Sequence, residues 1–163
     1  MTASLPTAPM TSWTTTAPQR GVVSRLVAAF LHVSTGLVLA AAVLGLSVAS
    51  AIIARGTVVA DPGDVATIRA LTPVFALFAV IAVAHVVAGI GMALGSRQAS
   101  SLGIGLGAFD AVAGVVALFV AATGSRGQVD GVGIAMTFVV MGVVLAVAAR
   151  AADWNTHGPV DPT

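Results

Sequence analysis

Two ionisable side chains, His85 and Asp110, lie near the middle of two long apolar stretches of the sequence. A carboxylate at the centre of a bilayer costs at least about 2.5–3.5 kcal/mol, so we expect it to be paired, protonated or facing water. A histidine next to a desolvated acid can exchange protons near neutral pH. The pair could therefore serve a proton path, an ion site or a small-molecule pocket. Alternatively, it is a buried hydrogen bond that fixes the pairing of two helices.

The spacing of His85 and Asp110 predicts that they meet. The polar segment 95–101 separates the two stretches, and if the tip of this turn lies between Arg97 and Gln98, it is equally far in sequence from both residues. In an antiparallel pair of straight helices, both side chains would lie about 16–19 Å from the turn, close to the bilayer midplane. The alternative is that they face different neighbours and never meet.

His32 is the other histidine within an apolar stretch, and we expect it to lie about one helical turn shallower than His85. Two histidines on neighbouring helices can ligate a b-type haem inside a four-helix membrane bundle. The difference in depth argues against such a site. The sequence therefore predicts no cofactor and no metal, with haem b as the alternative and His32 as an additional polar or ligand residue.

Catalysis and nucleic-acid binding are not expected. The chain has no Cys, Tyr, Lys or Glu, so most catalytic side chains are missing and no nucleophile stands next to a base. Its seven Arg and six Asp are scattered singly and give a net charge of +1. No basic patch is available for a phosphate backbone.

The composition indicates a membrane protein built from helices. Hydrophobic residues make up 58% of the 163 residues and charged residues 8%, and the mean hydropathy is +1.04. A membrane-spanning helix needs about 20 apolar residues. The sequence predicts an all-α domain over 21–150, with four transmembrane helices in an antiparallel up-down bundle. The expected spans are 28–51, 73–94, 102–122 and 132–149.

Polar segments flank and connect the predicted spans. Residues 1–20 are rich in Thr, Pro and Ala and are expected to form a disordered tail. Residues 151–163 are expected to form a polar tail with His157 exposed, and 55–70 a loop outside the hydrocarbon. Ser100 or Ser101 is expected to cap the third helix.

Four spans place both termini on one side of the membrane. That side carries four Arg against three on the other, so we expect a cell-membrane protein with cytoplasmic termini. Arg without Lys, together with abundant Ala, Val and Gly, indicates a G+C-rich bacterial genome.

Small residues are expected to set the packing, because lipid-immersed helices approach closely only where side chains are small. Glycines four residues apart flank the 95–101 turn and predict tight packing of the second span against the third. The candidate helix-packing residues are Gly36, Gly45, Gly91, Gly95, Gly103 and Gly107.

These observations lead to a non-catalytic accessory or interaction subunit that works in the lipid bilayer as a homo-oligomer or with other membrane proteins. A small transporter or proton-conducting protein using His85 and Asp110 is the alternative. A haem- or quinone-binding respiratory subunit and a pore-forming lysis protein are further alternatives.

Overall fold

The computed structural model describes residues 17–56, 62–123 and 129–158, and within them the chain forms four long helices. These are α1 (Ala17–Ala54), α2 (Pro62–Ala93), α3 (Arg97–Thr123) and α4 (Val129–His157). Each contains a stretch long and apolar enough to cross a membrane, namely Gly21–Ala54, Thr72–Ala93, Arg97–Thr123 and Val132–His157. The predicted all-α fold with four long apolar helices packed antiparallel is confirmed.

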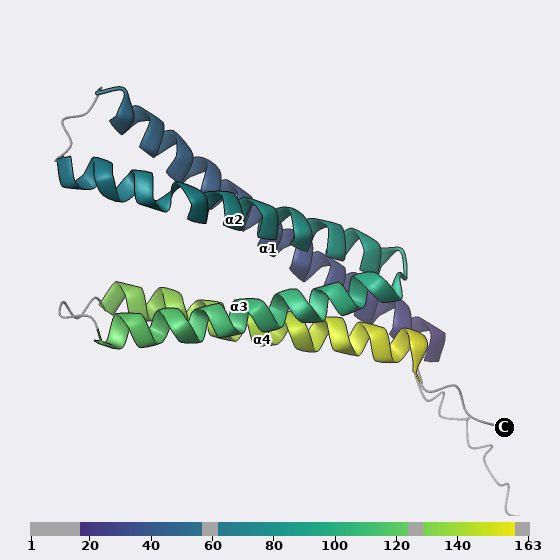
Figure 1. Ribbon diagram of the computed structural model, residues 1–163. Helices are drawn as coiled ribbons and strands as arrows, with labels where there is room; N and C mark the ends of the chain where they lie inside the picture. The colour runs from purple at the N-terminus through teal and green to yellow at the C-terminus, as the bar shows by residue number, and fades with distance from the viewer. Residues whose placement is uncertain (1–16, 57–61, 124–128, 159–163) are drawn as a thin grey trace, which may run out of the picture.

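The helices form two antiparallel pairs that lie close together at one end of the molecule and diverge toward the other (Figure 1). Helix α1 packs along α2, and α3 packs along α4. The pairs touch each other through α1 with α4 and through α2 with α3. We call the end with the α2–α3 turn the closed end and the opposite end the open end. The start of α1 and the finish of α4 also lie at the closed end (Figure 1).

The helices are longer than the expected spans. Helix α1 begins at Ala17, inside the predicted tail 1–20, and α4 continues to His157, inside the predicted tail 151–163. Helix α2 begins at Pro62, within the predicted loop 55–70, because proline suits the first helical position. The remaining parts of both tails lie outside the described residues, apart from Gly158.

The turn between α2 and α3 is shorter than the 95–101 segment. The N–H of Gly95 donates to the carbonyl of Met92 (3.0 Å) and the N–H of Ser96 to that of Gly91 (2.9 Å), which is a Schellman motif. Gly95 has a φ of +81°, a conformation that favours glycine. Ser96 then caps α3 by accepting the N–H of Ala99 on its Oγ (3.3 Å). The prediction of a cap at Ser100 or Ser101 was therefore wrong.

Close approach of one helix backbone to another occurs within each helix pair. At the α1–α2 crossing, a Cβ on Gly36 would lie 2.6 Å from the carbonyl oxygen of Ala82. At the α3–α4 crossing, a Cβ on Gly107 would lie 2.5 Å from the backbone nitrogen of Ala146. Of the glycines expected to pack span two against span three, Gly107 faces α4 instead. Gly91 and Gly103 do have neighbours across these spans, namely Ala99 of α3 and Met92 of α2. Gly89, Gly114 and Gly142, which were not among the predicted helix-packing residues, also lie at the two crossings.

The other selected glycines have different surroundings. Gly91 faces Ala99 across the turn. Gly103 faces three elements at once, because a Cβ there would lie 3.0–3.2 Å from His32, Met92 and Ala149. Gly45 has no atom within 4 Å of its Cβ position, so it makes no close helix contact among the described residues of this chain.

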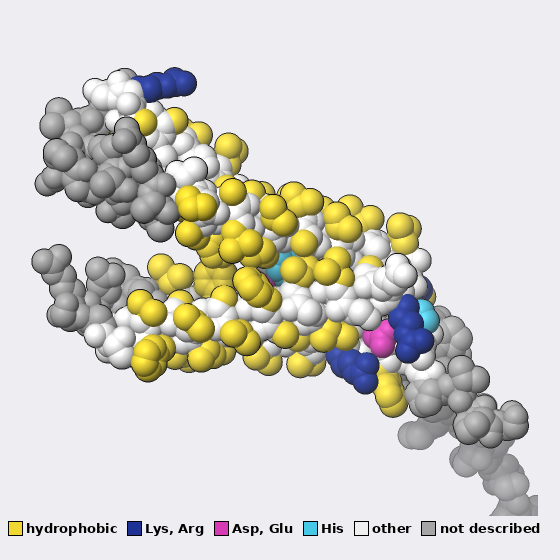
Figure 2. Space-filling view, viewed as in Figure 1, with side chains coloured by type: hydrophobic (Ala, Val, Ile, Leu, Met, Phe, Trp, Pro, Cys, Tyr) yellow, Lys and Arg dark blue, Asp and Glu magenta, His cyan; other side chains and the backbone are white. Residues whose placement is uncertain are grey.

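The buried core lies toward the closed end and consists mainly of small residues. Its members are Ala28, Ala29, Ala88, Met92, Ala149 and Ala152. Large apolar side chains instead cover the outside of all four helices (Figure 2). In water such a surface would be unfavourable, whereas in a bilayer it is the surface that lipid covers.

Candidate functional site

His32, His85 and Asp110 come together from three helices, α1, α2 and α3. The Nδ1 atoms of His32 and His85 lie 2.9 Å apart, within hydrogen-bond distance. The Nε2 atom of His85 lies 3.0 Å from Oδ2 of Asp110. Both histidines are fully buried and Asp110 is 5% exposed. His32 therefore lies level with His85, and the expected difference in depth was wrong.

A short motif shared by α1 and α2 places the two histidines against each other. His32 begins the segment HVSTG, which ends at Gly36, and His85 begins HVVAG, which ends at Gly89. Residues four apart lie on one face of a helix. A Cβ on Gly89 would lie 2.7 Å from the carbonyl oxygen of Ala29 on α1, and a Cβ on Gly36 would lie 2.6 Å from the carbonyl oxygen of Ala82 on α2. The crossing is therefore nearly symmetric about the two histidines. The repeated His-Val-x-x-Gly pattern could have revealed this contact from the sequence.

The possible hydrogen positions on His32, His85 and Asp110 depend on one another, because the three side chains are joined by the Nδ1–Nδ1 and Nε2–Oδ2 contacts. The Nδ1 contact needs a hydrogen on one ring and a lone pair on the other. If His32 donates, a neutral His85 carries its own hydrogen on Nε2 and presents it to a carboxylate of Asp110. If His85 donates, its Nε2 is bare, and Asp110 supplies the hydrogen. The ring of His85 thus links the protonation of Asp110 to that of His32.

The two ends of this group of side chains differ in their surroundings. The Nε2 atom of His32 is buried without a hydrogen-bond partner among the described residues and faces Gly103. The contact between His85 Nε2 and Asp110 has ion-pair distance, but the ring N–H does not point along the line to the oxygen. The His85–Asp110 contact is therefore at ion-pair distance without an aligned hydrogen bond.

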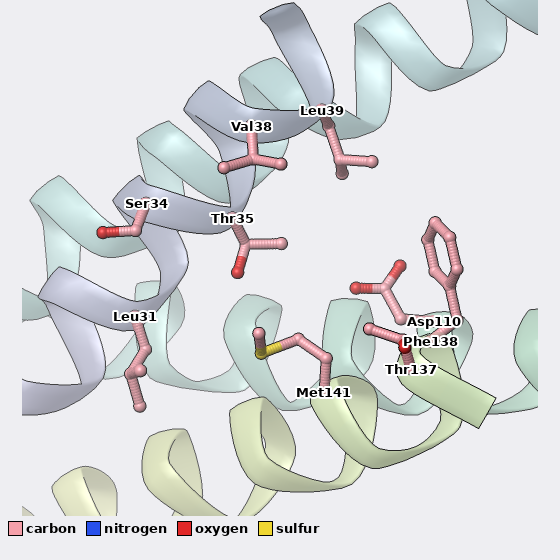
Figure 3. Close-up of a pocket in the computed structure, with 9 residues that line it drawn as sticks. All are labelled: Leu31, Ser34, Thr35, Val38, Leu39, Asp110, Thr137, Phe138 and Met141. Carbon is pink, nitrogen blue, oxygen red and sulfur yellow. The ribbon is translucent and has the colours of Figure 1, made fainter. Parts of the chain in front are cut away.

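Asp110 also faces a cavity of about 260 Å³ between the helix pairs. Figure 3 shows its carboxylate in the space between Thr35 and Leu39 of α1 and Phe138 of α4. In the space-filling view, a histidine side chain is visible at the bottom of the hollow between the two pairs (Figure 2). The cavity walls are mainly apolar, with three hydroxyl groups. The residues besides Asp110 are Leu31, Ser34, Thr35, Val38, Leu39, Thr137, Phe138 and Met141.

The histidine pair does not fit bis-histidine haem ligation. A porphyrin held by two histidines lies between their rings. The rings of His32 and His85 instead stack directly on each other, with centroids 5.1 Å apart and planes inclined by 25°. Within the described residues, no set of three or more His or Asp side chains has an arrangement that could hold a metal ion.

Comparison with known proteins adds no relative to these observations. No protein-family model, curated protein or solved structure matches the chain. What the molecule supports directly is a small polytopic membrane protein with a buried His32–His85–Asp110 group at the side of an apolar cavity.

Proposed function

We propose that the protein binds a small, mostly apolar molecule carrying a positive charge in the cavity between the helix pairs, and exchanges it for a proton on Asp110. The observation that carries this proposal is the position of Asp110. Among the described residues of the cavity lining, its carboxylate is the one ionisable group, and the others are apolar or carry a hydroxyl group. The role is binding and proton-linked transport, without catalysis.

The low polarity of the cavity supports exchange of a cation for a proton. An ionised carboxylate without a counter-charge is costly in a membrane interior, so we expect Asp110 to hold a proton when the cavity is empty. A bound cation can replace that proton without leaving a net charge in the site. On exchange, the O–H bond of Asp110 breaks and the proton leaves to water at the mouth of the cavity, while the bound cation balances the carboxylate that remains.

The closed end supports a carrier over a channel. Beyond His32 the interior is filled by Met92, Ala149 and Ala152, which are fully buried. The described residues therefore fill the interior on that side of the histidines, which suits one state of an alternating carrier. Because these residues fill the interior, the described part of a single chain contains no pore of the kind that a lysis protein would need.

The proposed topology places the closed end in the cytoplasm. Arg25 and Arg97 lie there, with Arg25 against Gly95 of the turn and Arg97 at the start of α3. Positively charged residues accumulate on the cytoplasmic side of membrane proteins. The cavity would then open toward the outer half of the membrane.

Binding can be tested with benzyltrimethylammonium, an aromatic cation that carries no proton of its own. Calorimetry of the purified protein in buffers of different ionisation enthalpy would measure the protons released. We expect about one proton for each cation bound, and about tenfold weaker binding with no release in Asp110→Asn. Asp153→Asn, which removes a carboxylate at the closed end, is the matched control and should behave like the wild type.

An uncharged analogue of benzyltrimethylammonium, in which carbon replaces the nitrogen, tests whether binding requires the positive charge. Equal binding of the analogue and the cation would contradict the proposal and favour a neutral ligand such as a quinone. Transport needs a second experiment, in which proteoliposomes with an outwardly directed proton gradient accumulate the cation. Accumulation that survives Asp110→Asn would rule out the exchange.

The accessory-subunit hypothesis has less support from the fold. It rested on glycine-rich faces left for a partner, yet Gly36, Gly103 and Gly107 are in contact within the chain itself. A reproducible partner that co-purifies in mild detergent, together with no cation binding, would restore it.

A further inference from the structure

A group of basic side chains surrounds one acid on the outside of the closed end. Asp153 of α4 lies 3.9 Å from Nε of Arg97 on α3 and 3.5 Å from Nη1 of Arg150. Nδ1 of His157 is also 3.5 Å from the same carboxylate. Asp153 is 12% exposed, whereas the side chains of Arg97 and Arg150 are 72% and 62% exposed. Figure 2 shows an acidic side chain flanked by basic ones at this end.

This arrangement leaves positive charge without a partner. One carboxylate neutralises one guanidinium, so the Arg97, Arg150 and Asp153 group carries a net positive charge even with His157 neutral. Asp153 also holds the two guanidinium groups near each other across the α3–α4 pair. At the open end, residues 55–70 and 124–131 of the sequence contain three Arg and three Asp. The charge excess therefore belongs to the closed end.

An apolar groove of about 540 Å³ begins beside these charges. Its rim includes Arg150 and Trp154, and the guanidinium carbon of Arg150 lies 6.0 Å from the centroid of the Trp154 ring. Its floor consists of Ile104 from α3 with Ala146, Val147 and Ala151 from α4. The groove thus joins a basic, aromatic rim to an apolar floor that continues toward the middle of the helices.

We propose that this groove binds an anionic phospholipid, with the phosphate on the exposed side of the Arg97 and Arg150 guanidinium groups and one acyl chain along the floor. Arginine binds phosphate through paired N–H donors, and tryptophan is suited to the boundary between headgroups and hydrocarbon. The net positive charge favours an anionic lipid over a zwitterionic one. The apolar floor favours a lipid over free phosphate, because phosphate would leave it uncovered. The lipid site uses none of the cavity residues, so it does not depend on the proposed cation exchange.

The test uses the fluorescence of Trp154 in the full-length protein. The chain has two tryptophans, so Trp13→Phe leaves Trp154 as the single reporter. The protein is reconstituted with mixtures of ordinary phosphatidylcholine and lipids brominated near the top of the chain, which quench tryptophan on contact. We expect brominated phosphatidylglycerol to bind beside Trp154 about fivefold more strongly than brominated phosphatidylcholine.

Two charge substitutions separate the site from a general effect of charge. Arg97→Gln removes one guanidinium and leaves Arg150 over the Trp154 ring, and it should reduce the preference to near one. Arg55→Gln removes the same charge from an exposed position after α1, far along the chain from the groove, and should leave the preference unchanged. Equal quenching by the two lipids, or equal losses in the two variants, would overturn the proposal.

Inorganic phosphate distinguishes a lipid from a free anion. At millimolar concentration it should leave quenching by brominated phosphatidylglycerol unchanged, because it cannot replace the acyl chain in the groove. Displacement of the lipid by phosphate would show an anion site without lipid recognition and would contradict the proposal.

Discussion

His32 and His85 touch through their Nδ1 atoms, which lie 2.9 Å apart, and both rings are fully buried. Two positive rings at that distance in a low-dielectric interior would repel each other strongly, so at most one of them is charged. Since each ring supplies what the other needs, a hydrogen or a lone pair, the contact is lost if either is removed. The two histidines therefore act as one unit, and His85 connects that unit to Asp110.

This shared contact predicts that substitutions at the two histidines are not additive. We expect His32→Ala and His85→Ala each to lower the free energy of unfolding by about 1–2 kcal/mol. The double variant should fall short of the sum by about 0.6 kcal/mol, because the same contact cannot be lost twice. Unfolding in mixed micelles of mild detergent and dodecyl sulfate measures all three. The pair His85→Ala and His157→Ala is the control and should be additive, since His157 contacts Asp153 instead.

Adding a single methyl group at Gly107 should lower the free energy of unfolding strongly. A Cβ there would lie 2.5 Å from the backbone nitrogen of Ala146 and 2.7 Å from the carbonyl oxygen of Gly142, so α3 and α4 would have to separate. We expect Gly107→Ala to reduce the free energy of unfolding by about 1–3 kcal/mol. Gly105→Ala, on the same helix with no atom within 4 Å, should be neutral or stabilising by up to about 1 kcal/mol. Similar effects of the two variants would contradict the packing described for α3 and α4.

Gly95 combines a left-handed backbone with a close side chain, and a second glycine separates the two effects. Both Gly95 and Gly56 have positive φ, +81° and +69°, so alanine at either position costs about 1–2 kcal/mol. Only at Gly95 would the new Cβ also displace the guanidinium of Arg25, whereas Gly56 has open space. In the same unfolding assay, Gly95→Ala should cost more than Gly56→Ala. The difference should disappear when Arg25 is replaced by Ala in both variants.

The sequence predicted the fold and the meeting of His85 with Asp110 for simple physical reasons. Long apolar runs can only be spanning helices, because every backbone polar group must be satisfied within the membrane. A short turn then makes neighbouring helices antiparallel. The count from the turn was imperfect, since α3 begins at Arg97 and not after Ser101. The two side chains lie 3.0 Å apart in the structure all the same.

The choice of helix partners could not be predicted in the same way. Apolar residues surround each helix, so no amphipathic stripe marks the buried face. Glycines occur on several faces, and only the structure shows that Gly107 approaches α4 while Gly45 has no described residue within 4 Å of its Cβ position. The cavity depends on this choice, because it lies where the α1–α2 pair separates from the α3–α4 pair. His32 was misplaced for a related reason, since its depth follows from the α1–α2 crossing at Gly36 and Gly89.

The cavity itself can be tested by filling it without touching Asp110. Thr137 lines the cavity and its side chain is exposed. Its hydroxyl donates a hydrogen bond to the carbonyl of Gly133 (2.9 Å) on its own helix. Thr137→Phe places an aromatic ring in the proposed ligand space and should weaken binding of benzyltrimethylammonium at least about tenfold in calorimetry. Thr137→Val keeps the shape and removes only the hydroxyl, so it should bind within about twofold of the wild type. Because the position faces open space, both variants should unfold at wild-type detergent concentrations. Undiminished binding in Thr137→Phe would place the cation elsewhere, even if Asp110→Asn abolished it.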